Sequence, residues 1–103
     1  MDNIPKLAGF DWDGANLGKC SKHGVSPQEI EALLRGTPHV APDGKHSAQE
    51  KRCLAIGRTP AGRYVFVAFT LREKDGVTLL RPISARYMHK KEVTAYEKKG
   101  ASL

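Results

Sequence analysis

The stretch that decides the fold runs from Arg63 to Arg86 and reads RYVFVAFTLREKDGVTLLRPISAR. Its first half is rich in β-branched and aromatic residues, and Tyr64 to Phe69 is apolar on both faces of the predicted strand. Lys74-Asp75-Gly76 is a turn signal, and a second largely apolar run, Val77 to Arg86, follows it. The stretch therefore predicts two antiparallel strands, the first of them central in a sheet and covered by helices on at least one side.

Shorter segments on the amino-terminal side extend this sheet. Arg52 to Arg58, followed by the turn Pro60-Ala61-Gly62, predicts a third strand of an antiparallel meander. Thr37 to Pro42 predicts a short strand, and Asp43-Gly44 with the polar run Lys45 to Lys51 predicts a hairpin or surface loop.

The first strand signal is the apolar stretch Leu7 to Trp12, which Asp13 and Gly14 close. It predicts an edge strand or an extended arm. None of these patterns indicates a parallel pair of strands, so we expect an antiparallel sheet.

Two helices are predicted between the first and second strands. Ala15 to Lys22 is helix-compatible, and Gly24 can end that helix in the left-handed conformation, which places His23 in the last turn. Ser26-Pro27-Gln28-Glu29 is a capping box with proline at the first helical position. Three apolar residues at helical spacing then form a core face before Gly36 stops the helix: Ile30, Leu33 and Leu34.

A last, amphipathic helix is predicted from His89 to Lys99, with a basic exterior. A chain of 103 residues leaves little room for a second core. We therefore predict one α+β domain over residues 1–103, in which a twisted antiparallel sheet carries two amino-terminal helices and is followed by a short carboxy-terminal helix.

The charge balance favours a polyanionic partner. There are 17 Lys and Arg against 11 Asp and Glu, a net charge of +6. RNA, DNA, an anionic membrane and an acidic protein all fit this charge, and so does a protein for which the charge serves only solubility. No apolar run is long enough for a signal peptide or a membrane span, so we expect a cytoplasmic protein without membrane contact.

Several classes of chemistry lack their signatures. The sequence has no Walker loop, GxGxxG motif or nucleophile elbow. Cys20 and His23 stand at a ligand-like spacing, but His39, His46 and His89 do not complete a four-ligand set, so no metal and no cofactor are expected. Both cysteines, Cys20 and Cys53, are interpreted as buried, inert thiols.

The remaining chemistry lies in the second half of the chain. Arg72 and Arg86 end successive strands and could converge on a phosphate. Arg81 interrupts an apolar strand, so it must reach a cleft or pair with a carboxylate such as Glu73 or Asp75. Further basic or proton-transferring residues lie nearby: Arg58, Arg63, Tyr87, His89, Lys90 and Lys91.

These residue types suffice for metal-free cleavage of RNA by its own 2′-hydroxyl, which needs proton transfer and positive charge at the phosphorane. In this interpretation His89 or Tyr87 moves protons while Arg72, Arg81 and Arg86 hold the phosphate. The other interpretation is that strand-end arginines are solvated or salt-bridged and that the final lysines form a solvated helix face.

Six short segments, in order, carry a resemblance that covers nearly the whole chain. They are Phe10-Asp11-Trp12-Asp13, Lys22-His23-Gly24-Val25-Ser26, Pro42-Asp43 with His46-Ser47, Ala55-Ile56-Gly57, Val67-Ala68-Phe69-Thr70, and the run from Arg81 to Glu92. With this ordered combination the chain resembles the BrnT toxin family.

The resemblance implies a RelE-like fold and a ribonuclease toxin of a type II toxin–antitoxin pair. It also implies a BrnA-like antitoxin, whose DNA-binding domain would bring the complex to operator DNA. By position, Arg72, Arg81 and Arg86 match the family's basic face, and Glu92 matches the glutamate that opens its last helix. His23 matches as well, although a packing or capping role at a helix end suits it equally.

Two other functions fit the same residues. A module that binds nucleic acid without cutting it would use every basic residue in the same way. A degenerate toxin could act mainly with its antitoxin as a co-repressor. For the ribonuclease we expect Arg81→Ala and Arg86→Ala each to abolish toxicity while the fold stays intact.

Overall fold

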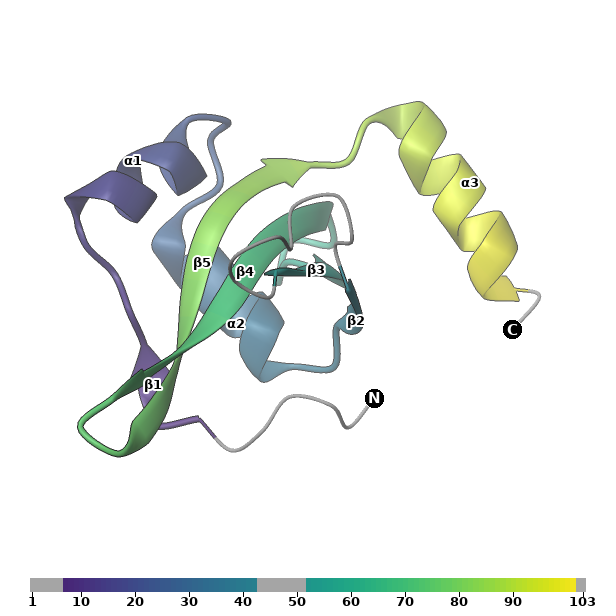
Figure 1. Ribbon diagram of the computed structural model, residues 1–103. Helices are drawn as coiled ribbons and strands as arrows, with labels where there is room; N and C mark the ends of the chain where they lie inside the picture. The colour runs from purple at the N-terminus through teal and green to yellow at the C-terminus, as the bar shows by residue number, and fades with distance from the viewer. Residues whose placement is uncertain (1–6, 43–51, 102–103) are drawn as a thin grey trace.

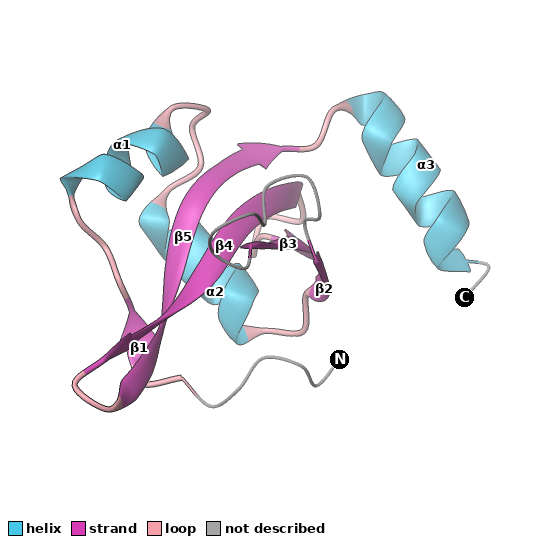
Figure 2. Cartoon of the chain, in the orientation of Figure 1, coloured by secondary structure: helices cyan, strands magenta, loops and turns pink. Residues whose placement is uncertain are grey.

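The computed structural model describes residues 7–42 and 52–101, which form an α+β fold of five strands and three helices (Figures 1 and 2). This confirms the predicted fold class. The strands are β1 (Gly9–Phe10), β2 (His39–Pro42), β3 (Arg52–Arg58), β4 (Tyr64–Lys74) and β5 (Val77–Tyr87). The helices are α1 (Gly14–Ser21), α2 (Pro27–Arg35) and α3 (Lys90–Ala101).

The strands form one sheet in the order β1-β5-β4-β3-β2. The predicted meander is confirmed, because β2 to β5 pair antiparallel with their neighbours. The expectation of an entirely antiparallel sheet is wrong, since β1 pairs parallel with the outer edge of β5. No hairpin joins β1 to β5. The connection between them is long, so it permits either a parallel or an antiparallel pairing.

The β4–β5 hairpin turns at Asp75 and Gly76, whose φ angles are +52° and +81°. Two successive positive φ values match the twist of a two-residue hairpin, as the turn signal predicts. Further from this turn, the register of the β4–β5 ladder changes from Ala68 opposite Ser84 to Phe69 opposite Pro82, so Ile83 is an extra residue in β5. A bulge of this kind accommodates proline, which has no N–H to donate to the ladder.

Both amino-terminal helices begin at side-chain caps. The Asp13 carboxylate accepts the backbone N–H groups of Ala15 and Asn16 at the start of α1. Ser26 and Glu29 form the predicted capping box of α2. At the other end of α1, Gly24 has a φ of +87°. Because α1 already ends at Ser21, His23 lies in the turn after the helix and not in its last turn.

The core lies between the two amino-terminal helices and one face of the sheet. Ile30, Leu33 and Leu34 are buried, as their helical spacing predicts. They pack with the inward-facing residues of the central strands, among them Val65, Val67, Phe69, Ala55 and Leu80. In Figure 1, α2 is seen behind β4 and β5, and we call the opposite face of the sheet, on which α2 does not lie, the open face.

The carboxy-terminal helix α3 stands beside the sheet and not on it (Figure 1). In the part of the chain that the structure describes, no helix is long and apolar enough to cross a membrane. The predicted loop at Asp43-Gly44 and Lys45 to Lys51, together with His46 and Ser47 of the family resemblance, lies outside the described residues.

The packing of α2 on β3 predicts that Gly57→Ala destabilises the protein. A Cβ atom at Gly57 would lie 2.7 Å from Cγ of Leu33. Such overpacking costs about 1–3 kcal/mol in the free energy of unfolding, measured by urea denaturation. The matched control is Gly18→Ala in α1, where an added Cβ meets nothing within 4 Å. That control should stabilise the protein by about 0.5–1 kcal/mol, and equal effects of the two changes would contradict the packing.

Candidate active site

A pocket of about 340 Å³ lies on the open face of the sheet. Alternation along the strands brings Arg52, Phe66 and Arg86 to this face, because Phe66 pairs with Arg86 and Arg52 pairs with Thr70. His23 lines the same pocket from the turn after α1. Two guanidinium groups and one imidazole therefore surround one hollow above an apolar floor.

Arg86 is the most firmly held basic side chain of this pocket. Its two terminal nitrogens donate to the two carboxylate oxygens of Glu92, each at 2.8 Å. Its guanidinium carbon lies 4.6 Å from the centre of the Phe66 ring. The Arg86 side chain remains 39% exposed. A fixed and accessible guanidinium is suited to binding an anionic ligand without first losing rotamer freedom.

Glu92 joins the end of β5 to the start of α3. Besides Arg86 it accepts the backbone N–H of His89 at 2.8 Å, which caps the helix. The hydrogen bond from Arg86, followed by the N–H of His89, lowers the pKa of Glu92 from 4.5 to about 2. The same contact with Glu92 raises the pKa of Arg86. Glu92 is thus an anion at physiological pH, and it holds Arg86 in place.

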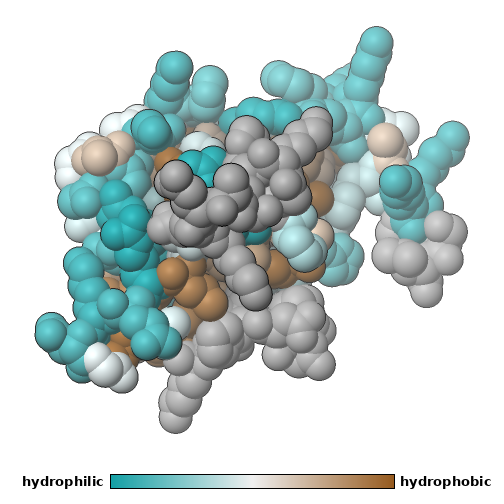
Figure 3. Space-filling model, in the orientation of Figure 1, coloured by the Kyte–Doolittle hydropathy of each residue, from teal (hydrophilic) through white to brown (hydrophobic). Residues whose placement is uncertain are grey.

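Arg52 was not among the candidate residues that the sequence singled out. It looked like the start of a strand, and only the register of β3 against β4 shows that it faces the same way as Phe66 and Leu54. The sequence could have indicated this position, because Arg52, Leu54 and Ile56 are two residues apart in a predicted strand and therefore lie on one face of it. Among the described residues visible in Figure 3, most are hydrophilic, and apolar ones appear as separate patches.

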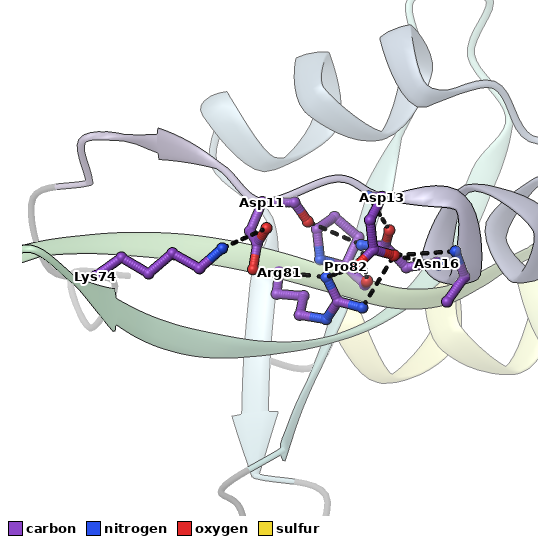
Figure 4. A network of polar contacts seen from close by, with 7 residues as sticks. Asp11, Asp13, Asn16, Lys74, Arg81 and Pro82 are labelled. Carbon is purple, nitrogen blue, oxygen red and sulfur yellow. Dashed lines mark hydrogen bonds and ion pairs between the residues drawn. The ribbon is translucent and has the colours of Figure 1, made fainter.

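Arg81 lies in an ion-pair network that fastens the first elements to β5 (Figure 4). It contacts the carboxylate of Asp13 at 3.0 Å and that of Asp11 at 3.5 Å. Lys74 reaches Asp11 from β4 at 3.4 Å. The hydrogen bond from Arg81 lowers the pKa of Asp13. The expected carboxylate partner exists, but it comes from the segment between β1 and α1 and not from Glu73 or Asp75.

Asn16 completes this attachment with uncharged hydrogen bonds. Its side-chain amide donates to the carbonyl oxygens of Asp11 and Pro82, both at 2.8 Å. Asn16 is only 3% exposed, so these bonds satisfy a buried donor. Asn16 and Arg81 together hold α1 against the bulged part of β5.

The structure does not bring Arg72 and Arg86 together. In the antiparallel ladder Arg72 pairs with Leu79, near the hairpin turn, whereas Arg86 pairs with Phe66 at the other end of β4. Phe66 and Arg72 are six positions apart in β4, which corresponds to about 20 Å along the strand. The expected convergence on one phosphate is therefore wrong, because antiparallel strands place their carboxy-terminal ends at opposite ends of the sheet.

The remaining candidates surround the carboxy-terminal end of β5. The hydroxyl of Tyr87 donates to the Glu29 carboxylate of α2 at 3.0 Å, and Arg63 stacks on the Tyr87 ring at 3.6 Å. Burial, followed by the contact with Glu29, raises the pKa of Tyr87. The other candidates, all exposed, are Arg58, His89, Lys90 and Lys91.

The two cysteines have different environments. Cys20 is fully buried, and this burial raises the pKa of its thiol to about 11, as an inert core thiol requires. Cys53 is half-buried, so the prediction of two buried cysteines is wrong for this residue. His23 is exposed while Cys20 is in the core, so they share no site. Within residues 7–42 and 52–101, no three His, Cys, Asp or Glu side chains are grouped so that they could hold a metal ion.

Comparison with protein families identifies the chain. The model of the family described as ribonuclease toxin, BrnT, of type II toxin-antitoxin system matches residues 12–92. The chain belongs to the BrnT family. No match was found among curated proteins. Membership of a type II system implies an antitoxin partner for this BrnT protein. The matched region includes the open-face pocket and ends at Glu92, the partner of Arg86.

We predict that Arg81→Ala lowers the stability of this BrnT protein. Among the side chains that the structure describes, Asp11 would keep Lys74 as its one cationic partner, although the Asp11 side chain is only 11% exposed. Loss of one of the two cationic partners of a largely buried carboxylate should cost about 2 kcal/mol in the free energy of unfolding, measured by urea denaturation. Lys74→Ala is the matched control, since this exposed lysine contacts the same carboxylate and should cost less than about 1 kcal/mol. If Arg81→Ala left the midpoint of urea denaturation unchanged, the stabilising role of the Arg81 ion pairs would be contradicted.

A second prediction concerns the Arg86–Glu92 pair and pH. The pKa of Glu92 in the folded protein is about 2 against an ordinary value of 4.5. The pair therefore stabilises the fold fully above about pH 4.5, and this contribution is lost as the pH falls towards 2. The stability difference between the wild type and Glu92→Gln should be constant near neutral pH and vanish near pH 2. A difference that persists at pH 2 would show that the charged pair is not its source.

Proposed function

We propose that this BrnT protein is a metal-independent endoribonuclease that cleaves RNA and thereby inhibits translation and growth. The observation that carries the proposal is the open-face pocket, where Arg86, fixed by Glu92 and Phe66, lies with Arg52 and His23. Family membership supports the ribonuclease class, and the pocket supplies the residue types that such a reaction needs.

In the proposed reaction the 2′-hydroxyl of the substrate is the nucleophile. It loses its proton, the bond from O2′ to phosphorus forms, and the bond from phosphorus to O5′ breaks. The leaving O5′ takes up a proton, so the products are a 2′,3′-cyclic phosphate and a 5′-hydroxyl. Arg86 and Arg52 would bind the phosphate and stabilise the charge that accumulates on its oxygens. His23 is the proposed proton-transfer group because it lines the same pocket.

The sequence assigned catalytic parts to Arg72, Arg81, Tyr87 and His89 as well, and in this proposal they and the other candidate residues have supporting parts. His89, Lys90 and Lys91 lie at the start of α3 next to the Arg86–Glu92 pair, where they would bind flanking phosphates. Tyr87 and Arg63 would position the end of β5 through their contacts with Glu29 and with each other. Arg81 would hold β1 and α1 against β5 through Asp11 and Asp13. Arg72 would add positive charge along the sheet, and Arg58 would bind RNA beside Tyr64.

The proposed partner is a BrnA-like antitoxin, and the proposed fold type is RelE-like, in a single domain. An inhibitor of the pocket must cover the charges that RNA needs, so its contact surface should be acidic or apolar. Operator DNA would be bound through the antitoxin complex. The proposed location is the cytoplasm, where both the RNA substrate and such a partner are present.

The test is induced expression in a bacterial host, comparing wild type with Arg86→Ala for growth and for integrity of total RNA. We expect the wild type to arrest growth and fragment RNA, and Arg86→Ala to lower the cleavage rate at least about 100-fold. Arg86→Lys keeps the charge but loses the two-pronged contact, so it should remain strongly impaired.

The matched control is Arg35→Ala, which removes the same charge from an exposed position on α2. This control should remain as toxic as the wild type. Growth arrest with intact RNA would favour the binding-only module, and harmless expression of folded wild type would favour the degenerate toxin. Full activity of folded Arg86→Ala would overturn the proposed site.

A further inference from the structure

A second and larger pocket, of about 640 Å³, lies between the carboxy-terminal end of α2, the adjoining ends of β2 and β3, and α3. Its size falls in the range of small-molecule sites. The cleavage proposed above takes place at the other pocket, and of this pocket's side chains only Arg58 was given a part in it. Its distinguishing side chains are aromatic or polar: His39, Arg58, Tyr64, Tyr96 and Glu97.

The aromatic side chains form a connected wall. The rings of Tyr64 and Tyr96 meet edge to face with their centres 5.4 Å apart. His39 lies 5.7 Å from Tyr96, and the Tyr96 hydroxyl forms a hydrogen bond with Nδ1 of His39. The Arg58 guanidinium carbon lies 4.8 Å from the centre of the Tyr64 ring. Planar groups from four elements therefore converge on one hollow.

The pocket also contains a carboxylate. Glu97 of α3 accepts a hydrogen bond from the Tyr64 hydroxyl at 3.3 Å, and Glu97 is exposed. A carboxylate repels a phosphate group, whereas it accepts hydrogen bonds from N–H donors on the edge of a base. Planar side chains together with a carboxylate suit a nucleobase, while the pocket at Arg86 suits a phosphate.

Side chains from one face of β4 line both pockets, Phe66 the first and Tyr64 the second, and the second pocket also extends to α2. Tyr64 and Phe66 point the same way from β4, about 7 Å apart along the strand. Phe66 underlies Arg86 in the first pocket, and its other neighbour across the ladder, Ile56, lines the second. A single strand of RNA with one phosphate at Arg86 can thus place a nearby base against Tyr96.

We propose that this pocket binds one unpaired nucleobase of the RNA substrate and favours guanine. Guanine presents two adjacent N–H donors, at N1 and N2, to a carboxylate such as Glu97, and no other RNA base does. The identity of the ligand as RNA rests on the function proposed above. The pocket would then contribute to the sequence preference of cleavage, since the phosphate contacts at Arg86 carry no base information.

The test measures binding of RNA that cannot be cleaved. Fluorescein-labelled 2′-O-methyl pentanucleotides with G, A, C or U between two flanking uridines on each side are titrated with protein, and anisotropy is recorded. The wild type should bind the guanine oligonucleotide about tenfold more tightly than the uridine one. Tyr96→Ala should weaken binding of all four about tenfold, because stacking is lost. Glu97→Gln should abolish the preference for guanine and leave the other three affinities nearly unchanged.

Two further variants control for folding and charge. Tyr96→Phe retains the ring and should bind within about twofold of the wild type, so a defect in Tyr96→Ala alone comes from the missing ring. Lys98→Ala, on the same helix, should weaken all four oligonucleotides equally without changing their order. Equal binding of the four oligonucleotides by wild type, or wild-type binding by Tyr96→Ala, would overturn the proposal.

These outcomes are independent of catalysis. The 2′-O-methyl group removes the nucleophile, so binding is measured whether or not the protein cleaves RNA. Tyr96-dependent guanine binding by a protein without ribonuclease activity would support the pocket and reject the proposed function. Ribonuclease activity that needs Arg86, with no dependence of binding on Tyr96 or Glu97, would reject the pocket alone.

Discussion

The β4–β5 ladder, with the bulge opposite Ala68 and Phe69, is the constraint on which the rest of this structure depends. Arg81 and Arg86 are five residues apart, and in a regular strand this odd separation would place them on opposite faces. The extra residue Ile83 changes the alternation, so that Arg81 pairs with Thr70 and Arg86 with Phe66, two residues on the same face of β4. One inserted residue thus decides the arrangement of charge across the sheet.

The same residue type has two uses on this strand. Arg81 is nearly covered, with 15% of its side chain exposed, and it holds Asp11 and Asp13 so that β1 and α1 lie against β5. Arg86 is more accessible and is held from one side by Glu92, which leaves the guanidinium pointing into a pocket with His23 and Arg52. Burial and the position of the nearest carboxylate distinguish a structural arginine from one available to a ligand.

The contacts of α3 connect the two pockets. Its first turn carries Glu92, which fixes Arg86, and its later turns carry Tyr96 and Glu97, which line the second pocket. A helix that lies beside the sheet and not on it can therefore affect both pockets at once. In the proposed reaction this arrangement would couple the binding of a base to the position of a phosphate along the same strand of RNA.

The sequence by itself determined the elements and most of the core. Alternation and turn chemistry predict the meander, and the capping box and apolar spacing predict α2, because these signals act between residues close in the chain. Family resemblance was also readable from the order of short segments. The tertiary structure decided the parallel pairing of β1, the separation of Arg72 from Arg86, the aspartate partners of Arg81, and the meeting of Arg52, His23 and Arg86 in one pocket. Each of these depends on strand register or on contacts between residues far apart in the chain, which local patterns do not specify.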